Sequence, residues 1–277
     1  CIRDSNKNVL SKIDLLTISN IAKKISGIHL DQSKKYIINS IISRRIREVN
    51  AENINDYFKL MESREGEYEK EKMISALTTN VTSFFREKHH FDYLHKLLCC
   101  DFHAEVMREE GIRIWSSACS SGEEAYSAAM TAAEAVNYSH IKKIKILGTD
   151  IDPEMIRRAQ DGIYFKNNIP KNFLEKFNKF CDFSGEEFYF SRNIKNLVLF
   201  KKLNIIGEWP FQAKFHAIFC RNVTIYFDKK TTDLLWRRLS SRLHIKGEIY
   251  IGHSERITNF EELGLRPIGI NAYKKVV

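Results

Sequence analysis

The sequence predicts an α/β fold: a mostly parallel sheet covered by helices, with a small inserted antiparallel β-subdomain, preceded by a small all-α domain. Residues 11 to about 85 carry only helical patterns. From about residue 113 onward, short apolar runs alternate with helical stretches, which is typical of a parallel sheet covered by helices. Residues 185–203 interrupt this alternation with two apolar runs around a polar turn. We therefore predict an all-helical domain with a linker at 1–85 and an α/β domain at 86–277.

The first domain contains a predicted amphipathic helix over residues 33–49. Its apolar side chains recur at helical spacing and form one stripe that can pack on neighbouring helices, namely Ile38, Ile41, Ile42, Ile46 and Val49. Arg44, Arg45 and Arg47, with Lys35 nearby, make the polar side strongly basic. This helix is therefore a candidate for binding an acidic partner.

The other elements follow from the same two periodicities. Further helices of the first domain are predicted at 53–61 and 67–77. The candidate strands of the second domain are 112–116, 145–149, 215–220 and 248–251, with helices at 123–136, 153–160 and 231–243. Phe188–Phe190 and Leu197–Phe200 flank Ser191-Arg192-Asn193, and we predict that the two runs pair as the antiparallel ribbon of the inserted subdomain.

Composition narrows the function classes. At 43% hydrophobic and 29% charged residues, the chain is typical of a globular protein rather than a disordered or fibrous one. No apolar run approaches the roughly 20 residues of a membrane span, and the first residues do not resemble a signal peptide. The 6 cysteines show no zinc-like spacing, so we expect reduced thiols, a cytoplasmic location and no metal. The net charge of +9 leaves three readings open: a nucleic-acid partner, an acidic protein helix, or a compositional bias.

Ligands of open α/β sheets bind beyond the carboxyl ends of the strands, so polar residues there are informative. The first strand is followed by a loop of small residues, 116–122, which lets the backbone approach a ligand, and then by Glu123 and Glu124. A tight strand–helix turn, with glutamates that favour the helix N-terminus, is the alternative. Because both glutamates would repel a pyrophosphate, a cationic ligand fits better.

The next two strand ends add a carboxylate and a candidate substrate site. Asp150 lies where such folds bind a ribose diol, while Asp152 is a candidate cap for the helix that Pro153 opens. An acidic pocket for an amine and a ribose, without phosphate-binding residues, is what S-adenosylmethionine needs. Asn222 and Tyr226 follow the third strand, where substrate is expected, although a buried tyrosine with a satisfied hydroxyl is the alternative.

Together these segments resemble the signature motifs of the CheR family, the chemotaxis receptor glutamate methyltransferases. The motifs occur in order at 76–91, 115–127, 149–152, 219–228 and 252–255. The resemblance implies a Rossmann-like S-adenosylmethionine-dependent methyltransferase domain that esterifies glutamate side chains on receptors. The family's loop commonly has Pro where this chain has Ala125, and Met is frequent where it has Thr224.

The resemblance also implies roles for individual residues. Arg86 and Tyr226 would act in catalysis, because they would orient the reacting carboxylate and the methyl donor. The cofactor-binding residues would be Asn80, Thr82, Arg86, Glu123, Asp150, Asn204, Ile205, Arg221 and Asn222. Glu123 would bind the amino group, Asp150 the ribose, and Asn204 with Ile205 the adenine edge.

The implied partner is the cytoplasmic domain of methyl-accepting chemotaxis receptors, whose acidic helices would dock on Arg44, Arg45 and Arg47. No nucleic acid and no membrane insertion are expected. Two rival functions are a nucleic-acid methyltransferase, which the positive charge favours but which lacks a recognisable base-flipping motif, and a noncatalytic S-adenosylmethionine-binding sensor. Retention of Arg86 and Tyr226 argues against the sensor.

Overall fold

The computed structural model describes residues 10–31, 35–78, 80–102, 104, 111–136 and 138–277. The chain divides into two compact units, and each is described by itself. The helical unit comprises Cys1–Asn80 together with Tyr226–Asp228, and the α/β unit comprises Val81–Ile225 and Lys229–Val277. The division therefore falls after Asn80, whereas the sequence prediction placed it after residue 85, and a short segment of the second half joins the helical unit.

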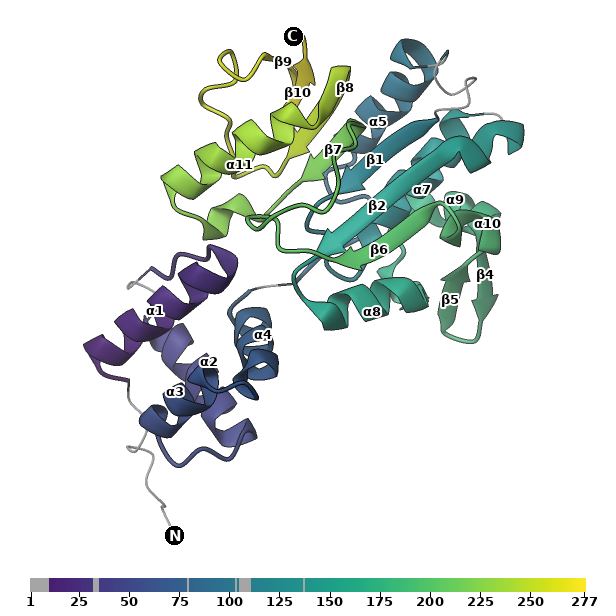
Figure 1. Ribbon diagram of the computed structural model, residues 1–277. Helices are drawn as coiled ribbons and strands as arrows, with labels where there is room; N and C mark the ends of the chain where they lie inside the picture. The colour runs from purple at the N-terminus through teal and green to yellow at the C-terminus, as the bar shows by residue number, and fades with distance from the viewer. Residues whose placement is uncertain (1–9, 32–34, 79, 103, 105–110, 137) are drawn as a thin grey trace. The chain divides into compact units, whose positions relative to one another are not determined.

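The helical unit is built from α1 (Lys12–Ser26), α2 (Lys35–Glu48), α3 (Ile54–Glu62) and α4 (Gly66–Leu77) (Figure 1). Side-chain caps fix where two of them begin: Ser11 forms a capping box with Asp14, and the Asn53 side chain accepts bonds from Asn55 N and Asp56 N. The predicted apolar stripe of α2 is largely confirmed, because Ile38, Ile42 and Ile46 are buried.

The segment Tyr226–Asp228 is bound to the end of α1 and the residues that follow it. His29 N donates to the Tyr226 carbonyl at 2.7 Å, and Ile28 forms an antiparallel bridge with Phe227. Lys23 Nζ lies 2.7 Å from Asp228 Oδ2. These three contacts explain why this segment groups with the helices although it follows a strand of the other unit.

The α/β unit contains a seven-stranded sheet in the order β6-β2-β1-β7-β8-β10-β9. Its strands are β1 (Ile112–Ser116), β2 (Ile144–Asp150), β6 (Val198–Lys202), β7 (Phe215–Cys220), β8 (Leu243–Ile251), β9 (Leu265–Gly269) and β10 (Ala272–Lys275). The first five strands of that order run parallel, and β10 is antiparallel to both of its neighbours. The four strands predicted from apolar runs are therefore confirmed as β1, β2, β7 and β8.

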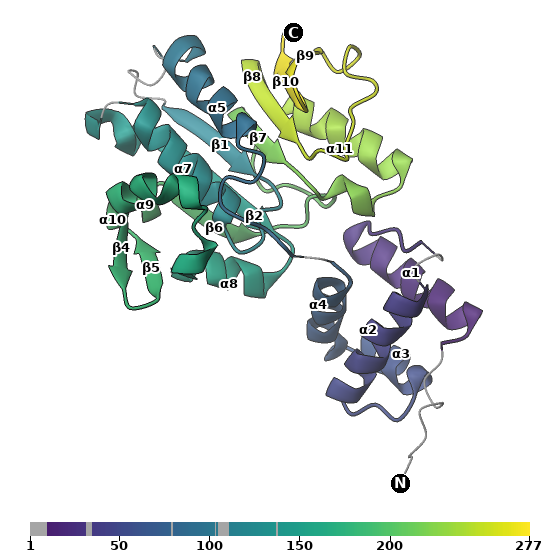
Figure 2. The same cartoon turned by 180° about the vertical axis from the view of Figure 1, so that it is seen from behind.

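Helices cover both faces of this sheet. α5 (His89–Lys96) and α7 (Glu123–Ala135) lie on one face, and α11 (Lys229–Ser241) lies on the other (Figures 1 and 2). The remaining helical elements are η2 (Leu97–Asp101), η3 (Tyr138–Lys143), α8 (Pro153–Asp161), η4 (Lys166–Asn168), η5 (Lys171–Phe173), α9 (Leu174–Phe180), α10 (Arg192–Lys195) and η6 (Thr224–Tyr226). No helix among the described residues is long and apolar enough to cross a membrane.

The inserted antiparallel subdomain exists, but its predicted strand pairing is wrong. β5 (Glu187–Phe190) pairs with β3 (Ile163–Phe165) and β4 (Cys181–Ser184) in a separate three-stranded sheet. The second run of the predicted ribbon is β6, which joins the main sheet parallel to β2. An apolar run does not specify its partner strand, and here the short helix α10 separates the two runs.

Candidate active site

The loop between β1 and α7 depends on a glycine where the helix begins. Gly122 has φ +99°, a left-handed conformation that L side chains rarely adopt. A Cβ atom at this position would also lie 2.8 Å from Ala159 Cβ and 3.0 Å from the Tyr164 hydroxyl. The loop can therefore pass close to α8 and present the first turn of α7, with Glu123 and Glu124, at the carboxyl end of the sheet.

Asp150, at the end of β2, is bound to that loop. Its Oδ2 accepts a hydrogen bond from Ser120 N at 2.8 Å, and its Oδ1 accepts one from Asp152 N at 3.0 Å. Burial raises the pKa of this carboxyl to about 6, against the two backbone hydrogen bonds, which lower it. Asp152 caps α8 through Glu154 N and Met155 N, as the sequence predicted. Because Asp152 is engaged as a helix cap, Asp150 stays the candidate for binding a ribose.

The two glutamates at the start of α7 have different partners. Glu124 Oε1 accepts from Ser116 Oγ at 2.6 Å, and its Oε2 lies 3.3 Å from Arg221 Nη1. Glu123 is buried, and Ser121 Oγ donates to its Oε2 at 2.7 Å. Burial raises the pKa of both carboxyls, and Arg221 opposes this at Glu124. Because a guanidinium already faces Glu124, Glu123 is the better candidate for a cationic ligand.

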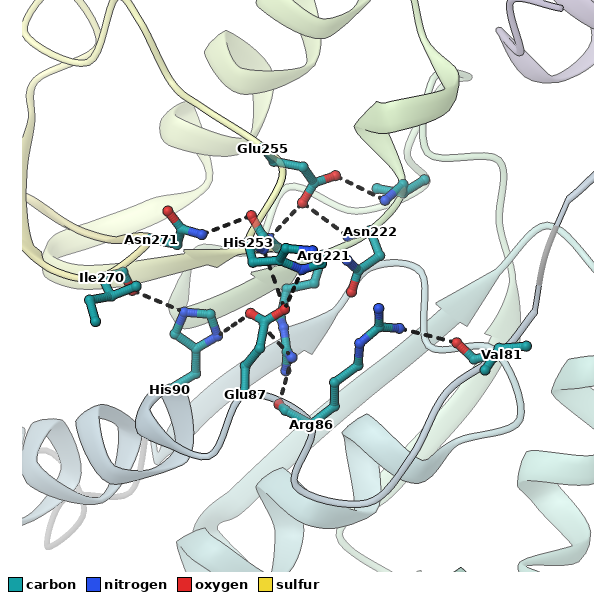
Figure 3. Close-up of polar contacts among 12 residues, drawn as sticks. Val81, Arg86, Glu87, His90, Arg221, Asn222, His253, Glu255, Ile270 and Asn271 are labelled. Atoms are coloured by element: carbon teal, nitrogen blue, oxygen red, sulfur yellow. Dashed lines mark hydrogen bonds and ion pairs between the residues drawn. The ribbon is translucent and has the colours of Figure 1, made fainter. Parts of the chain in front are cut away.

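Arg86 lies in the segment between Val81 and α5 (Figure 3). Its Nη1 donates to the Val81 carbonyl at 3.1 Å, and its own carbonyl accepts from Arg221 Nη2 at 2.5 Å. The preceding residue is attached to α7, because Phe85 N donates to Ser127 Oγ at 3.0 Å and that hydroxyl donates to the Glu123 carbonyl. The structure therefore brings Arg86 to the turn that carries Glu123.

Glu255 organises the loop after β7. Its buried carboxylate accepts backbone N–H bonds from four residues, namely Asn222, Val223, Thr224 and Gly252, and one more from the Thr224 hydroxyl. Asn222 has φ +58°. The Thr224 hydroxyl donates one of these bonds, which a methionine side chain at this position could not make. The hydrogen bonds to Glu255 therefore hold Asn222 in the left-handed region, which residues with side chains rarely adopt.

The predicted adenine-edge residues follow β6. Leu203 N donates to the Asp150 carbonyl at 2.8 Å, so this loop lies beside the proposed ribose residue. The Ile205 carbonyl accepts from Trp209 Nε1 at 2.9 Å, and the Ile206 carbonyl accepts from Arg238 Nη1 at 2.9 Å. Backbone groups of this loop are thus held in place from two sides.

The predicted basic contacts of α2 do not lie together. Arg44 and Arg47 are exposed, whereas the Arg45 side chain is 11% exposed and forms an ion pair with Glu69 on α4, Nη2 to Oε2, at 2.5 Å. Arg44 points away from α4 although it is next to Arg45 in the sequence, because successive residues of a helix are rotated by about 100° around its axis. Arg45 therefore has a structural partner inside the helical unit, and Arg44 and Arg47 remain the candidates for contact with a partner protein.

Two carboxylates of the site, the half-buried Glu87 and the buried Glu255, received no role from the sequence although both lie within the motifs. Their signal is their position beside Arg86 and after Gly252, but their partners are distant in the chain. Glu87, His89 and His90 also bring possible metal ligand atoms within 4.8 Å of one another. Since Arg221 Nη2 lies 3.5 Å from Glu87 Oε2, a guanidinium already supplies positive charge there and would repel a metal cation.

The chemistry of these groups fits S-adenosylmethionine. Two buried carboxylates, Glu123 and Asp150, are attached to one loop of small residues, where an amine and a ribose can be bound without a phosphate site. Thr82 and Asn222 are half-buried in the same unit, and Asn80 and Tyr226 belong to the helical unit.

Comparison with known proteins gives the same answer over most of the chain. Residues 80–267 match the family model described as the CheR methyltransferase SAM binding domain, and residues 13–78 match the CheR methyltransferase all-alpha domain. A chemotaxis protein methyltransferase of Borreliella burgdorferi is 36% identical over 267 residues, covering 93% of this chain and 93% of that protein. The Escherichia coli chemotaxis protein methyltransferase is 34% identical over 257 residues, covering 91% and 87%. With both domains matched in order, the chain belongs to the CheR family and is an S-adenosylmethionine-dependent methyltransferase of chemotaxis.

Proposed function

We propose that this methyltransferase esterifies glutamate side chains on the cytoplasmic domain of chemotaxis receptors. The observation that carries the proposal is a guanidinium, Arg86, attached through Phe85 and Ser127 to the turn that bears a buried acidic residue, Glu123. A site of this kind combines an acidic pocket for a cationic methyl donor with a cationic group for a carboxylate substrate.

S-adenosylmethionine supplies a methyl group on a positively charged sulfur. In the proposal, Glu123 binds its amino group and Asp150 its ribose, while Asn204 and Ile205 bind the adenine edge. Asn80, Thr82 and Asn222 complete the cofactor-binding set. The buried position of Asp150 and its two backbone hydrogen bonds support a fixed orientation of the carboxylate toward a diol.

A glutamate substrate needs no general base, because its pKa of about 4.3 leaves it ionised at pH 7. The protein must instead align the carboxylate and exclude water, which is catalysis by positioning. In the proposal, Arg86 holds the substrate carboxylate through two parallel hydrogen bonds, and Tyr226 orients it or the methyl donor. The exposed Arg44 and Arg47 of α2 bind the acidic receptor helix and steer its approach.

The test is incubation of the enzyme with radiolabelled methyl donor and purified receptor cytoplasmic fragments. We expect label on the receptor that alkali releases as methanol, because carboxyl methyl esters are base-labile whereas methylated amines are not. A parallel reaction uses receptor fragments whose candidate glutamates are replaced by alanine, which should remain unlabelled. Alkali-stable label, or equal labelling of the alanine fragments, would contradict glutamate esterification.

A further inference from the structure

The backbone around Arg86 adopts a conformation that local sequence does not favour. Phe85 and Glu87, on either side of Arg86, have φ values of +54° and +56°. Residues with side chains rarely adopt this left-handed conformation, so contacts from elsewhere must hold it. Phe85 is held on one side: its ring stacks on Phe173 at 4.1 Å between centroids, and its N–H donates to Ser127 Oγ.

The other side is held by a buried charge cluster (Figure 3). Arg221, at the end of β7, has a side chain that is 2% exposed. Its Nη2 lies 3.5 Å from Glu87 Oε2 and donates to the Arg86 carbonyl at 2.5 Å. Its Nη1 lies 3.3 Å from Glu124 Oε2. One planar guanidinium therefore joins the Arg86 segment to β7 and to the first turn of α7.

His90 does not replace Arg221 as a partner of Glu87. Burial and the nearby Arg221 lower the pKa of His90 to about 3, so the ring is neutral at pH 7. Its Nε2 lies 3.2 Å from the Ile270 carbonyl, which can only accept, so Nε2 carries the proton. The Nδ1 atom that faces Glu87 at 3.4 Å is then an acceptor and cannot donate to the carboxylate. His253 contacts the other oxygen of Glu87, with its N donating to Oε1 at 3.3 Å and its Nδ1 3.4 Å from the same atom. The Arg221 guanidinium is the partner that is charged at any pH near neutrality, and it lies 3.5 Å from Glu87 Oε2.

We propose that Glu87 and Arg221 are positioning residues for methyl transfer: the pair fixes the peptide of Arg86, and through it the guanidinium that meets the substrate carboxylate. The inference rests on the proposed role of Arg86 and extends it to two residues that act through it. It also gives the Arg221 side chain a role in holding Arg86, since its Nη atoms face protein groups. A lysine at 221 could not make these contacts together, because an ammonium is a point charge on a flexible stem.

Two substitutions test the pair: Glu87→Gln removes the charge with little change in shape, and Arg221→Lys keeps the charge and loses the planar fork. Misplacement of a catalytic group by about 1 Å can lower a rate about 100-fold, so we expect kcat to fall roughly 10- to 100-fold in each variant. The Kd for S-adenosylhomocysteine, measured by calorimetry, should change by less than about threefold, because Asp150 and Glu123 remain in place. The matched control is Glu248→Gln, a buried carboxylate on β8 paired with Lys274 at 3.2 Å, which should keep wild-type kcat.

A double-mutant cycle distinguishes positioning of Arg86 by Glu87 from a purely structural role of Glu87. If Glu87 acts through Arg86, Glu87→Gln should cost less than about twofold in kcat when introduced into Arg86→Ala. An equal loss in both backgrounds would overturn the proposal.

Hydrogen exchange supplies a readout that needs no methylation. Peptides covering residues 81–90 should exchange faster in Glu87→Gln and Arg221→Lys but not in Glu248→Gln. If wild-type enzyme fails to esterify receptor fragments, the proposed function fails, while unchanged exchange of this segment in both variants overturns the positioning role alone.

Discussion

Each unit of the protein has an arginine paired with carboxylates, but the two clusters join different kinds of structure. In the helical unit, Arg45 binds Glu69 through two parallel hydrogen bonds, Nε to Oε1 at 2.9 Å and Nη2 to Oε2 at 2.5 Å, and so joins α2 to α4. In the α/β unit, Arg221 joins Glu87, Glu124 and the Arg86 carbonyl, and the segment it holds has left-handed residues on both sides of Arg86.

The comparison of the two clusters indicates that an ion pair can maintain either the stability or the local geometry of a protein. The net stabilisation by such a pair is small, since the loss of hydration offsets much of the attraction, but removal of one partner leaves an uncompensated charge. Helices α2 and α4 are fixed by their own hydrogen bonds and apolar faces, so loss of their pair should cost stability. The Arg86 segment lacks regular hydrogen bonding, so loss of its pair should cost geometry and rate.

The largest expected effect is on the stability of the helical unit. Glu69→Ala removes the acceptor of the buried Tyr57 hydroxyl, which donates to Glu69 at 2.7 Å, and leaves Arg45 with only the exposed Glu48 as a carboxylate partner. We expect a loss of about 3 kcal/mol in the free energy of unfolding, measured by denaturant titration of the full chain. Glu67→Ala on the same helix is the control, because Glu67 is exposed and its pair with Lys70 should contribute less than about 1 kcal/mol. Equal, small losses in both variants would show that Arg45 and Glu69 are not an effective pair.

Catalytic substitutions should show the opposite separation, with rate affected and stability preserved. We expect Arg86→Ala and Tyr226→Phe to lower the methylation rate by up to about 100-fold, because each is proposed to orient a reacting group. S-adenosylhomocysteine affinity should change much less, since an orienting group matters mainly in the transition state. The measurement is steady-state methylation of receptor fragments beside calorimetry. If both variants turn over at the wild-type rate, the catalytic assignment is wrong.

Substitution of Asp150 should weaken cofactor binding more than it lowers the methylation rate at saturating cofactor. Asp150→Ala should weaken S-adenosylmethionine binding by about 1 to 3 kcal/mol, the usual loss of a hydrogen bond to a charged group. Asp182→Ala, an exposed carboxylate on β4, is the control. Calorimetry that finds equal affinity for both variants would remove Asp150 from the ribose site.

The same residue predicts a pH dependence. Because burial raises the Asp150 pKa to about 6, its carboxylate form is present above that pH and is lost as the pH falls through it. Cofactor affinity should therefore fall between about pH 7 and pH 5 in the wild type. Asp150→Ala should show a flatter profile over the same range, and parallel profiles would argue against this carboxyl as the titrating group.

The smallest expected effect concerns the exposed arginines beside Arg45. Reversing the charge at Arg44 and Arg47 should raise the apparent KM for receptor several-fold and flatten its salt dependence, because exposed charges act over roughly 8 to 10 Å at physiological salt. Cofactor affinity should not change. Reversal of the exposed Lys12 and Lys24 on α1 makes the same change in net charge and should leave the KM nearly unaltered. Wild-type kinetics for the Arg44 and Arg47 variant at low salt would show that this face of α2 is solvated and does not bind the receptor.

Local patterns in the sequence were sufficient to predict helices and strands, and to predict that the site lies at the carboxyl ends of the strands. Helical spacing predicted α2, and the caps Asn53 and Asp152 marked where α3 and α8 begin. Strand-end reasoning selected Asp150, which ends one apolar run, and the pair Glu123 and Glu124, which follows the loop after another, because the ends of parallel strands meet at one edge. The family resemblance then favoured Glu123. These features depend on residues within a few positions of one another, which is why the chain order alone was sufficient.

Tertiary packing decided the partners. The strand at 187–190 pairs with β3 and β4 rather than with 198–202, and Arg45 faces Glu69 although Arg44 and Arg47 beside it are exposed. Arg221 reaches the Arg86 carbonyl across 135 positions of the chain. Periodicity carries no information about such distances, because it reports which face of an element is apolar and not which element covers it. The partners of Arg221, on which its proposed role in positioning Arg86 depends, were thus decided by the packing of β7, α7 and the segment before α5.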